Sequence, residues 1–219
     1  MKSMAGVILG LALAAPAAAQ RPAPRPAAPP PPVLAVRVFA MATEQSFAAV
    51  ETVDATFGKT YGPFFGGGAQ LVVKDRFFAE VAVSRFQETG SRAFINAGQA
   101  FNLGIPLTAT ITPIELTGGY RFHLRSLPKA RPYVAAGLGS YGYQETSQFA
   151  AAGDDVDTRH AGFLLNGGVE FRLQRLVGLG VDVQYSHIPG ILGTGGVSPQ
   201  AGDSDLGGVA ARFSLVVGR

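Results

Sequence analysis

Fully charged side chains stand inside apolar stretches of this chain, where they could form ion pairs or take part in acid–base chemistry. The clearest case is PIELTGGYRFH, residues 113–123, which sets Glu115 and Arg121 among aliphatic and aromatic neighbours. An unpaired buried charge costs several kcal/mol, so such groups need partners of opposite sign. Arginine suits this role because its planar guanidinium can bridge two carboxylates at once. These residues therefore indicate a network of buried ion pairs.

The stretch QYSHIPG suggests a second chemistry, nucleophilic catalysis, because it sets Ser186 beside His187. A serine nucleophile must lie within hydrogen-bond reach of its base. Adjacent residues of a strand point to opposite faces, so these two cannot pair without a bulge. The position that would share the histidine's face is Pro189, while His123 and His160 lie near expected strand ends, where hydrogen-bonded rim histidines are common. We predict no catalytic residue and no enzymatic activity.

Metal and cofactor sites are not indicated either. The stretch AAGDDVDTR, with Asp154, Asp155 and Asp157, lacks the glycine and the distal glutamate of an EF-hand calcium loop, so we expect a solvated acidic loop. The glycine-rich residues 193–205 lie between expected strands, with no helix whose backbone amides could hold a phosphate. Cysteine is absent, which excludes disulfides and thiolate metal sites. We therefore predict no metal and no cofactor.

The beginning of the chain is predicted to be an export signal. Residues 1–19 combine an early lysine, an apolar run, a proline break and small residues, as a cleaved signal peptide does. Residues 20–33, QRPAPRPAAPPPPV, favour polyproline II and are expected to form a stiff periplasmic leader, with a docking motif for a proline-binding partner as the alternative. Residues 34–219 suit one domain. No later segment offers about 18 uncharged apolar residues, so no transmembrane helix is expected.

The charge balance argues against nucleic acid as a partner. The formal net charge is +3 at pH 7, and acidic and basic residues are interleaved along the chain rather than grouped in blocks. So small and dispersed a charge does not supply the basic face that binds phosphates in nucleic acids.

The elements that must position the charged groups are predicted to be strands. With 29 glycines and 15 prolines, long helical patterns are scarce, whereas alternating runs bounded by turn residues recur. Short connections alternate with long ones. An even number of strands with short turns at one end and long loops at the other is typical of an outer-membrane β-barrel whose termini are periplasmic. The eight runs are 34–43, 64–74, 76–87, 109–123, 131–144, 159–173, 176–187 and 205–218, and the long loops are 44–63, 88–108, 145–158 and 188–204.

Alternation within these runs predicts a barrel that is apolar outside and polar inside, the reverse of a soluble ligand-binding barrel. In residues 114–122 the even positions are apolar, whereas Glu115 and Arg121 share the other face. For residues 131–144 the pattern leaves open whether Tyr133 or Val134 faces lipid. An eight-stranded barrel is narrow enough for inward side chains to fill it. We therefore predict an interior charge network of Arg37, Lys74, Glu80, Glu115, Arg121, Glu170, Arg172, Asp182 and Arg212.

Aromatic residues are predicted to form girdles at the two membrane interfaces. Tryptophan, a frequent girdle residue, is absent. The girdle at the short-turn end is expected to contain Phe77, Tyr120, Phe122, Phe171 and Phe213, and the girdle at the long-loop end Phe64, Phe65, Tyr141, Tyr143 and Tyr185.

The strands ITPIELTGGYRF, ARPYVAAGLGSYGY, VDVQYSHI and GGVAARFSLVVG, together with the signal peptide, resemble small outer-membrane barrels of the OmpA/OmpX-like class. The resemblance spans residues 34–219 and rests on degenerate patterns. It implies an all-β fold, an eight-stranded antiparallel up-and-down transmembrane β-barrel in the cell outer membrane. Members of this class serve in envelope integrity, adhesion or minor pore formation, usually without enzymatic activity.

The function expected from these features is structural or interactive: a charge-plugged barrel with four surface loops. The alternatives are a small gated pore for ions or small solutes, a lipid-modifying enzyme on the same barrel, and a soluble periplasmic barrel with an apolar lumen. The expected partners are outer-membrane lipid, the barrel assembly machinery and an unidentified partner of the surface loops, and the barrel is expected to be a monomer.

Overall fold

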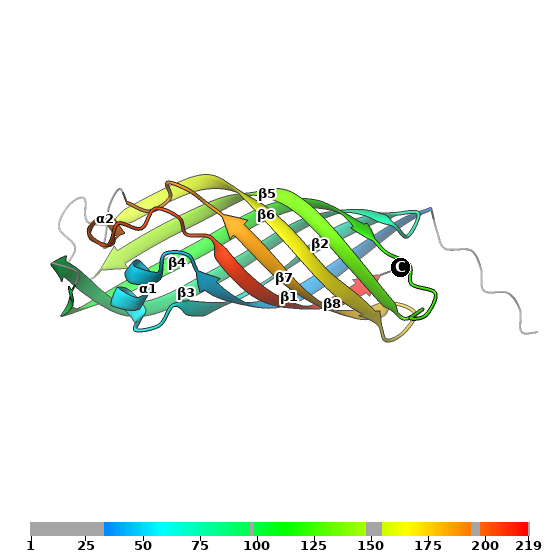
Figure 1. Ribbon diagram of the computed structural model, residues 1–219, viewed down its shortest axis with the longest axis horizontal. Helices are drawn as coiled ribbons and strands as arrows, with labels where there is room; N and C mark the ends of the chain where they lie inside the picture. Colours follow the sequence, from blue (N-terminus) through cyan, green and yellow to red (C-terminus); the bar gives the residue numbers. More distant parts are fainter. Residues whose placement is uncertain (1–32, 97–98, 148–154, 194–197, 219) are drawn as a thin grey trace, which may run out of the picture. The chain divides into compact units, whose positions relative to one another are not determined.

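A computed structural model describes residues 33–96, 99–147, 155–193 and 198–218 of the chain. The predicted signal peptide, the leader up to residue 32 and Asp154 lie outside the described residues. Eight strands form a closed sheet in which neighbours in sequence pair antiparallel and β1 pairs with β8 (Figure 1), which confirms the predicted up-and-down barrel. The strands are β1 (Leu34–Phe47), β2 (Tyr61–Val73), β3 (Phe77–Asn96), β4 (Gln99–Arg121), β5 (Ala130–Ser147), β6 (Val156–Arg172), β7 (Val177–His187) and β8 (Gly208–Gly218).

The strands are apolar outside and polar inside, as predicted. In β4, Ile114 and Leu116 are 43% and 60% exposed, whereas Glu115 and Arg121 are 6% and 2% exposed. Because successive side chains of a strand point to opposite faces, one face of each strand forms the outer surface and the other fills the lumen. Closure leaves no unpaired sheet edge, so the strands hold the inward side chains at fixed positions around the lumen.

Strand β5 settles which face of residues 131–144 points inward. Val134 is exposed, whereas the Tyr133 hydroxyl donates a hydrogen bond to Asp182 inside the barrel. Tyr141 and Tyr143 share the inner face and are buried, so their assignment to an aromatic girdle is wrong. The same holds for Phe64 in β2, which is buried in the lumen beside the exposed Phe65.

Strands β3 and β4 extend well beyond the predicted runs. Most of residues 88–108, expected to be a long loop, continue the β3–β4 hairpin. Pro113 lies inside β4. The pairing of β3 with β4 passes from Val83↔Ile114 to Phe86↔Ile111, and it is interrupted at Pro113, which has no backbone N–H to donate. A strand can therefore run through this proline at the cost of a local break in one ladder.

Two short helices lie at the long-loop end, opposite the end of β8 (Figure 1). Helix α1 (Val50–Phe57) was not predicted, and it ends at Gly58, whose φ of 67° is the left-handed conformation that glycine readily adopts. It buries Thr52, Val53 and Thr56. Helix α2 (Ser198–Ala201) is a single turn. Neither these nor any other helix of the described residues is long and apolar enough to span a membrane.

Candidate functional site in the barrel lumen

The lumen contains most of the charged residues expected there. Seven of the nine predicted network residues are buried. Lys74 and Arg172 are exposed, so their assignment to the interior is wrong. Lys74 follows the end of β2 in a tight turn with a positive φ, and Arg172 is the last residue of β6. Alternation ceases where a strand ends, so the side chains of both residues reach solvent at the rim. The seven buried residues are Arg37, Glu80, Glu115, Arg121, Glu170, Asp182 and Arg212.

One group of charges connects three strands across the lumen. The Glu170 carboxylate on β6 accepts hydrogen bonds from Arg37 on β1 and from Arg121 on β4, whose Nη2 lies 2.9 Å from Oε2. Arg121 also lies 3.7 Å from Asp75 in the turn between β2 and β3. One carboxylate therefore serves two guanidinium groups, an arrangement in which each charge depends on the others for compensation.

A second group surrounds Arg212 on β8. Its Nε donates to both carboxylate oxygens of Asp182, at 2.9 and 3.1 Å, and its Nη1 lies 3.6 Å from Glu80. Tyr133 donates a 2.6 Å hydrogen bond to Asp182, and Gln70 donates one of 2.9 Å to Glu80. Arg212 thus meets two carboxylates, as its planar donor group allows.

Glu115 has different partners from those expected. Its Oε1 accepts hydrogen bonds from the Tyr141 hydroxyl at 2.9 Å and from the Gln184 amide at 3.0 Å. These donors are neutral, and the described ion pairs do not join Glu115 to an arginine. The inward position of Tyr141 could have been found in the sequence, because it shares odd-numbered positions of β5 with Glu145, whose charge indicates the inner face.

Toward the long-loop end the lumen is filled by apolar side chains instead of charges. Phe47, Phe64 and Phe86 pack ring against ring with centroids 5.3 to 6.1 Å apart. Val53 of α1 joins them, so the helix packs over this end of the lumen. This cluster is difficult to predict from sequence, because its members come from five strands, helix α1 and the residue before it, and the segment between β7 and β8. The cluster comprises Phe47, Ala49, Val53, Phe64, Phe86, Ile111, Tyr141, Tyr143, Ile188, Ile191, Leu192 and Leu206.

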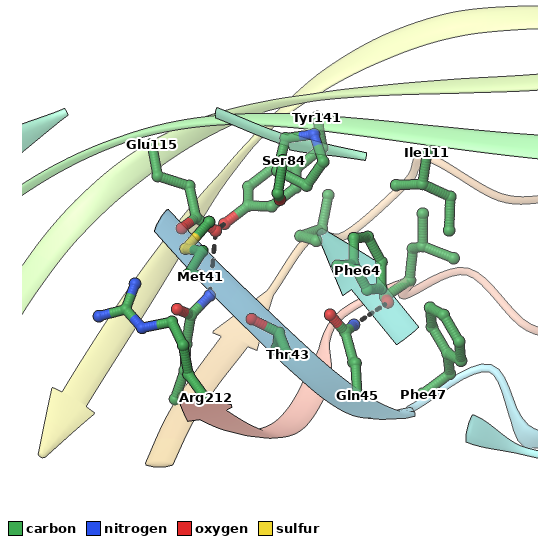
Figure 2. A pocket seen from close by; sticks show the side chains of 14 residues that line it. Met41, Thr43, Gln45, Phe47, Phe64, Ser84, Ile111, Glu115, Tyr141 and Arg212 are labelled. Carbon is green, nitrogen blue, oxygen red and sulfur yellow. Dashed lines mark hydrogen bonds between the residues drawn. The ribbon is translucent and has the colours of Figure 1, made fainter. Parts of the chain in front are cut away.

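A small pocket lies where the charged and apolar regions meet. Figure 2 shows Glu115 and Arg212 on one side of it and Phe47, Phe64 and Ile111 on the other. Its volume of about 20 Å³ is room for roughly one water molecule. A second pocket of about 20 Å³ lies among the charges, beside Arg121 and Glu170. Each of these two pockets among the described residues has room for about one water molecule.

Two of the three histidines, His187 and His123, form carboxylate pairs at opposite ends of the barrel. His187 Nδ1 lies 2.6 Å from Asp205, while Ser186 is buried on the opposite face of β7, as alternation requires. Burial raises the pKa of the Asp205 carboxyl, but hydrogen bonds from the backbone N–H groups of Ile188 and Gly207 and from His187 outweigh it and hold the pKa below its usual value. Asp205 therefore fastens the segment after β7 to the start of β8.

The turn carboxylate Asp75 has a similar environment at the other end. Its Oδ2 lies 2.9 Å from His123 Nε2 and 3.9 Å from Arg131. Burial raises its pKa, but the hydrogen bond from His123 and the charges of Arg121 and Arg131 outweigh this and lower the pKa. The structure brings no group of three or more His, Cys, Asp or Glu residues together to hold a metal within the described ranges. Asp155 and Asp157 instead accept hydrogen bonds from Ser147 and Gln144 of β5.

The sequence matches the family described as outer membrane protein beta-barrel domain over residues 5–214. The chain belongs to this family. The resemblance noted from its strands is thereby confirmed, and the polarity of the barrel is explained, since this outer-membrane barrel turns its apolar face toward lipid and its charges toward the lumen. A comparison with curated proteins finds no match.

Several solved outer-membrane barrels have a similar fold. Neisserial surface protein A (NspA) is 16% identical, with a TM-score of 0.51 over 85% of this chain and 96% of its own. The N-terminal β-barrel domain of Pseudomonas aeruginosa OprF is 12% identical, with a TM-score of 0.48 over 84% and 97%. Ail, the attachment invasion locus protein of Yersinia pestis, is 10% identical, with a TM-score of 0.45 over 84% and 96%. At these identities the likeness concerns the fold alone.

Proposed function

We propose that this outer-membrane barrel has a structural and interaction role, with a closed lumen and with surface loops that contact a partner outside the cell. Its termini and short turns are periplasmic, and its long-loop end is extracellular. No catalytic role is proposed, since Ser186 and His187 point to opposite faces and His187 is engaged by Asp205. In this role the barrel provides a rigid support, and the loops provide recognition.

The filling of the lumen is the observation that supports this proposal. Ion pairs centred on Glu170 and Arg212 fill the half near the short turns, and the aromatic cluster under α1 fills the other half. The pockets at Glu115 and beside Glu170 have volumes of about 20 Å³ each. Hydrated ions need a continuous wet path, which separate cavities of one-water size do not provide.

Planar-bilayer recordings of the refolded full chain test the closed lumen. We expect the wild type to produce no reproducible channel events. Arg121→Ala or Glu115→Ala is expected to raise leakage or to lower the stability of the barrel, because each leaves buried polar partners unsatisfied. Stable, uniform channels in the wild type would favour a small pore instead. Unchanged unfolding and conductance in both variants would refute the proposed role of the charges.

Single-cysteine labelling tests the orientation, because the natural chain has no cysteine. Asp155→Cys places a thiol at the long-loop end, and Arg125→Cys places one in a short turn. A membrane-impermeant maleimide added to intact cells should label the first variant and leave the second unlabelled until the outer membrane is permeabilised. The reverse pattern would show that the termini lie outside.

A further inference from the structure

The short-turn end of the barrel carries exposed cations that the lumen does not use. None of them forms an ion pair with another residue in the described part of the chain. The acidic residue of these turns, Asp75, already pairs with His123, Arg121 and Arg131. The exposed cations are Lys74 and Arg76 between β2 and β3, Arg125 and Lys129 between β4 and β5, and Arg172 and Arg175 between β6 and β7.

The opposite end has the opposite charge. Bases and acids are interleaved along the sequence, but an up-and-down barrel sends alternate connections to opposite ends and so separates them in space. At the long-loop end Lys59 is paired with Glu88, at 2.8 Å. Acidic residues outnumber basic ones there among the described residues: Glu44, Glu51, Asp54, Glu88, Asp155, Asp157, Asp203 and Asp205 stand against Lys59, Arg85, Arg92 and Arg159.

Exposed leucines lie beside the cations of the short turns. Leu124 and Leu127 flank Arg125, and Leu173 and Leu176 flank Arg175; all four leucines are between 39% and 56% exposed. Leucines that enter the acyl region beside cations that reach its surface are the combination found at membrane interfaces. A purely aqueous partner would leave these leucines without an apolar environment.

The cations are also spread around the rim of the barrel instead of forming one patch. They come from three turns, β2–β3, β4–β5 and β6–β7, which follow one another around the closed sheet. The turns joining β4 to β5 and β6 to β7 lie at the end of the barrel away from α1 and α2 (Figure 1). A folded protein bound to one side could not meet all three, whereas lipid headgroups surround a barrel completely.

We infer that the short-turn rim, defined by these six cations and four leucines, binds the phosphate groups of anionic phospholipids in the leaflet at that end. The inference goes beyond the proposed function and does not depend on whether the lumen conducts. Each lysine or arginine near the membrane surface favours contact with an anionic lipid over a neutral one by roughly fivefold at low ionic strength. This preference weakens as added salt screens the charges. The rim would therefore enrich anionic lipid around the barrel and fix its depth in the membrane.

Quenching of tryptophan fluorescence can test the lipid contacts of each end of the barrel separately, because the natural chain contains no tryptophan. Phe122→Trp places a reporter next to the short-turn rim, and Phe65→Trp places one on the outer surface toward the long loops. The full chain is refolded into phosphatidylcholine vesicles containing brominated phosphatidylglycerol or, separately, brominated phosphatidylcholine. We expect phosphatidylglycerol to quench the Phe122→Trp reporter about two- to fivefold more efficiently than phosphatidylcholine in low salt, and the preference to vanish in 1 M salt.

Charge variants assign the effect to the rim. The triple variant Arg125→Gln/Lys129→Gln/Arg175→Gln should abolish the lipid preference measured with the Phe122→Trp reporter. The three replaced side chains have no ion-pair partners among the described residues, so the variant should still fold. The control Lys59→Gln/Arg85→Gln/Arg159→Gln removes the same charge at the other end and should leave the preference intact. Equal quenching by both lipids in the wild type, or equal loss in both variants, would overturn the inference. Binding of purified peptidoglycan, with no lipid preference, would assign the rim to the cell wall instead.

Discussion

Glu170 is the residue on which the charge network depends most, because its single carboxylate compensates both Arg37 and Arg121. Strand alternation alone predicts that all three face inward. Alternation does not show where a strand ends, so it predicts Lys74 and Arg172 inside although both lie at the exposed rim. Nor does it show which charges meet across the lumen, because that depends on the stagger of the closed barrel. Glu115, paired with Tyr141 and Gln184, illustrates this limit.

Replacing Glu170 with alanine should therefore destabilise the barrel strongly. Two buried guanidinium groups lose their common partner, which we expect to lower the free energy of unfolding by about 3–5 kcal/mol. Arg172→Ala is the matched control, since it removes a charge from the exposed end of the same strand and should change stability by less than about 0.5 kcal/mol. Urea unfolding in lipid vesicles, followed by circular dichroism, measures both. Similar losses in the two variants would contradict the pairing.

Asp75 should make the stability of the short-turn end depend on pH. Its folded-state pKa is lowered by His123, Arg121 and Arg131, which outweigh the effect of burial. A lowered carboxyl pKa gives stability that is present above the unfolded-state value, near 4, and is lost as pH falls through the folded-state value. The stability difference between wild type and Asp75→Asn should thus be present at pH 6 and shrink below pH 4 in equilibrium unfolding. A difference that stays constant down to pH 3 would contradict this.

Strands were easier to predict than helices because a period of two recurs through a whole run. Helix α1 escaped prediction, although Val50, Val53 and Phe57 have helical spacing, because eight residues offer only two turns. The hairpin formed by β3 and β4 was underestimated for another reason. Its outer part contains a register shift between Ser91 and Ala93, which interrupts the alternation while the strands continue.

Gly68 shows how closely neighbouring strands constrain an element. A Cβ at this inward position of β2 would overlap the carbonyl oxygen of Val81 in β3, which cannot move without disturbing the ladder. Gly68→Ala should lower the free energy of unfolding by about 1–3 kcal/mol. The control is Gly118→Ala on the outer surface, where the nearest atom to a new Cβ is 3.9 Å away and the change should be within about 0.5 kcal/mol. Denaturant midpoints compare them, and equal midpoints would refute the steric argument.

The whole molecule combines a lipid-facing exterior with a lumen that is packed in two different ways. Charges and their hydrogen-bonding partners fill the half near the short turns, and aromatic packing under α1 fills the other. The overall fold could be predicted from sequence because the membrane imposes one rule on every strand. The two-part filling could not, since it depends on contacts between residues far apart in the chain, such as Phe47 with Phe86.

A closed barrel of this kind should resist unfolding by detergent without heat. We expect the unboiled protein to migrate faster in sodium dodecyl sulfate gels than the boiled protein, because the closed sheet stays compact, and to fractionate with the outer membrane. Recovery in the soluble periplasm, with the same mobility before and after boiling, would contradict the assignment of the apolar face to lipid.

The contacts of Glu170 also bear on the order of events in assembly. Arg37 on β1 and Glu170 on β6 lie on opposite sides of the seam where β8 pairs with β1, so we expect their ion pair to form only after the last strand has joined the first. Interactions that form after the rate-limiting step slow unfolding without speeding folding. Glu170→Ala should therefore open the barrel faster while inserting at nearly the wild-type rate. The Arg37–Glu170 pair would then act as a latch that holds a completed barrel shut and takes no part in building it.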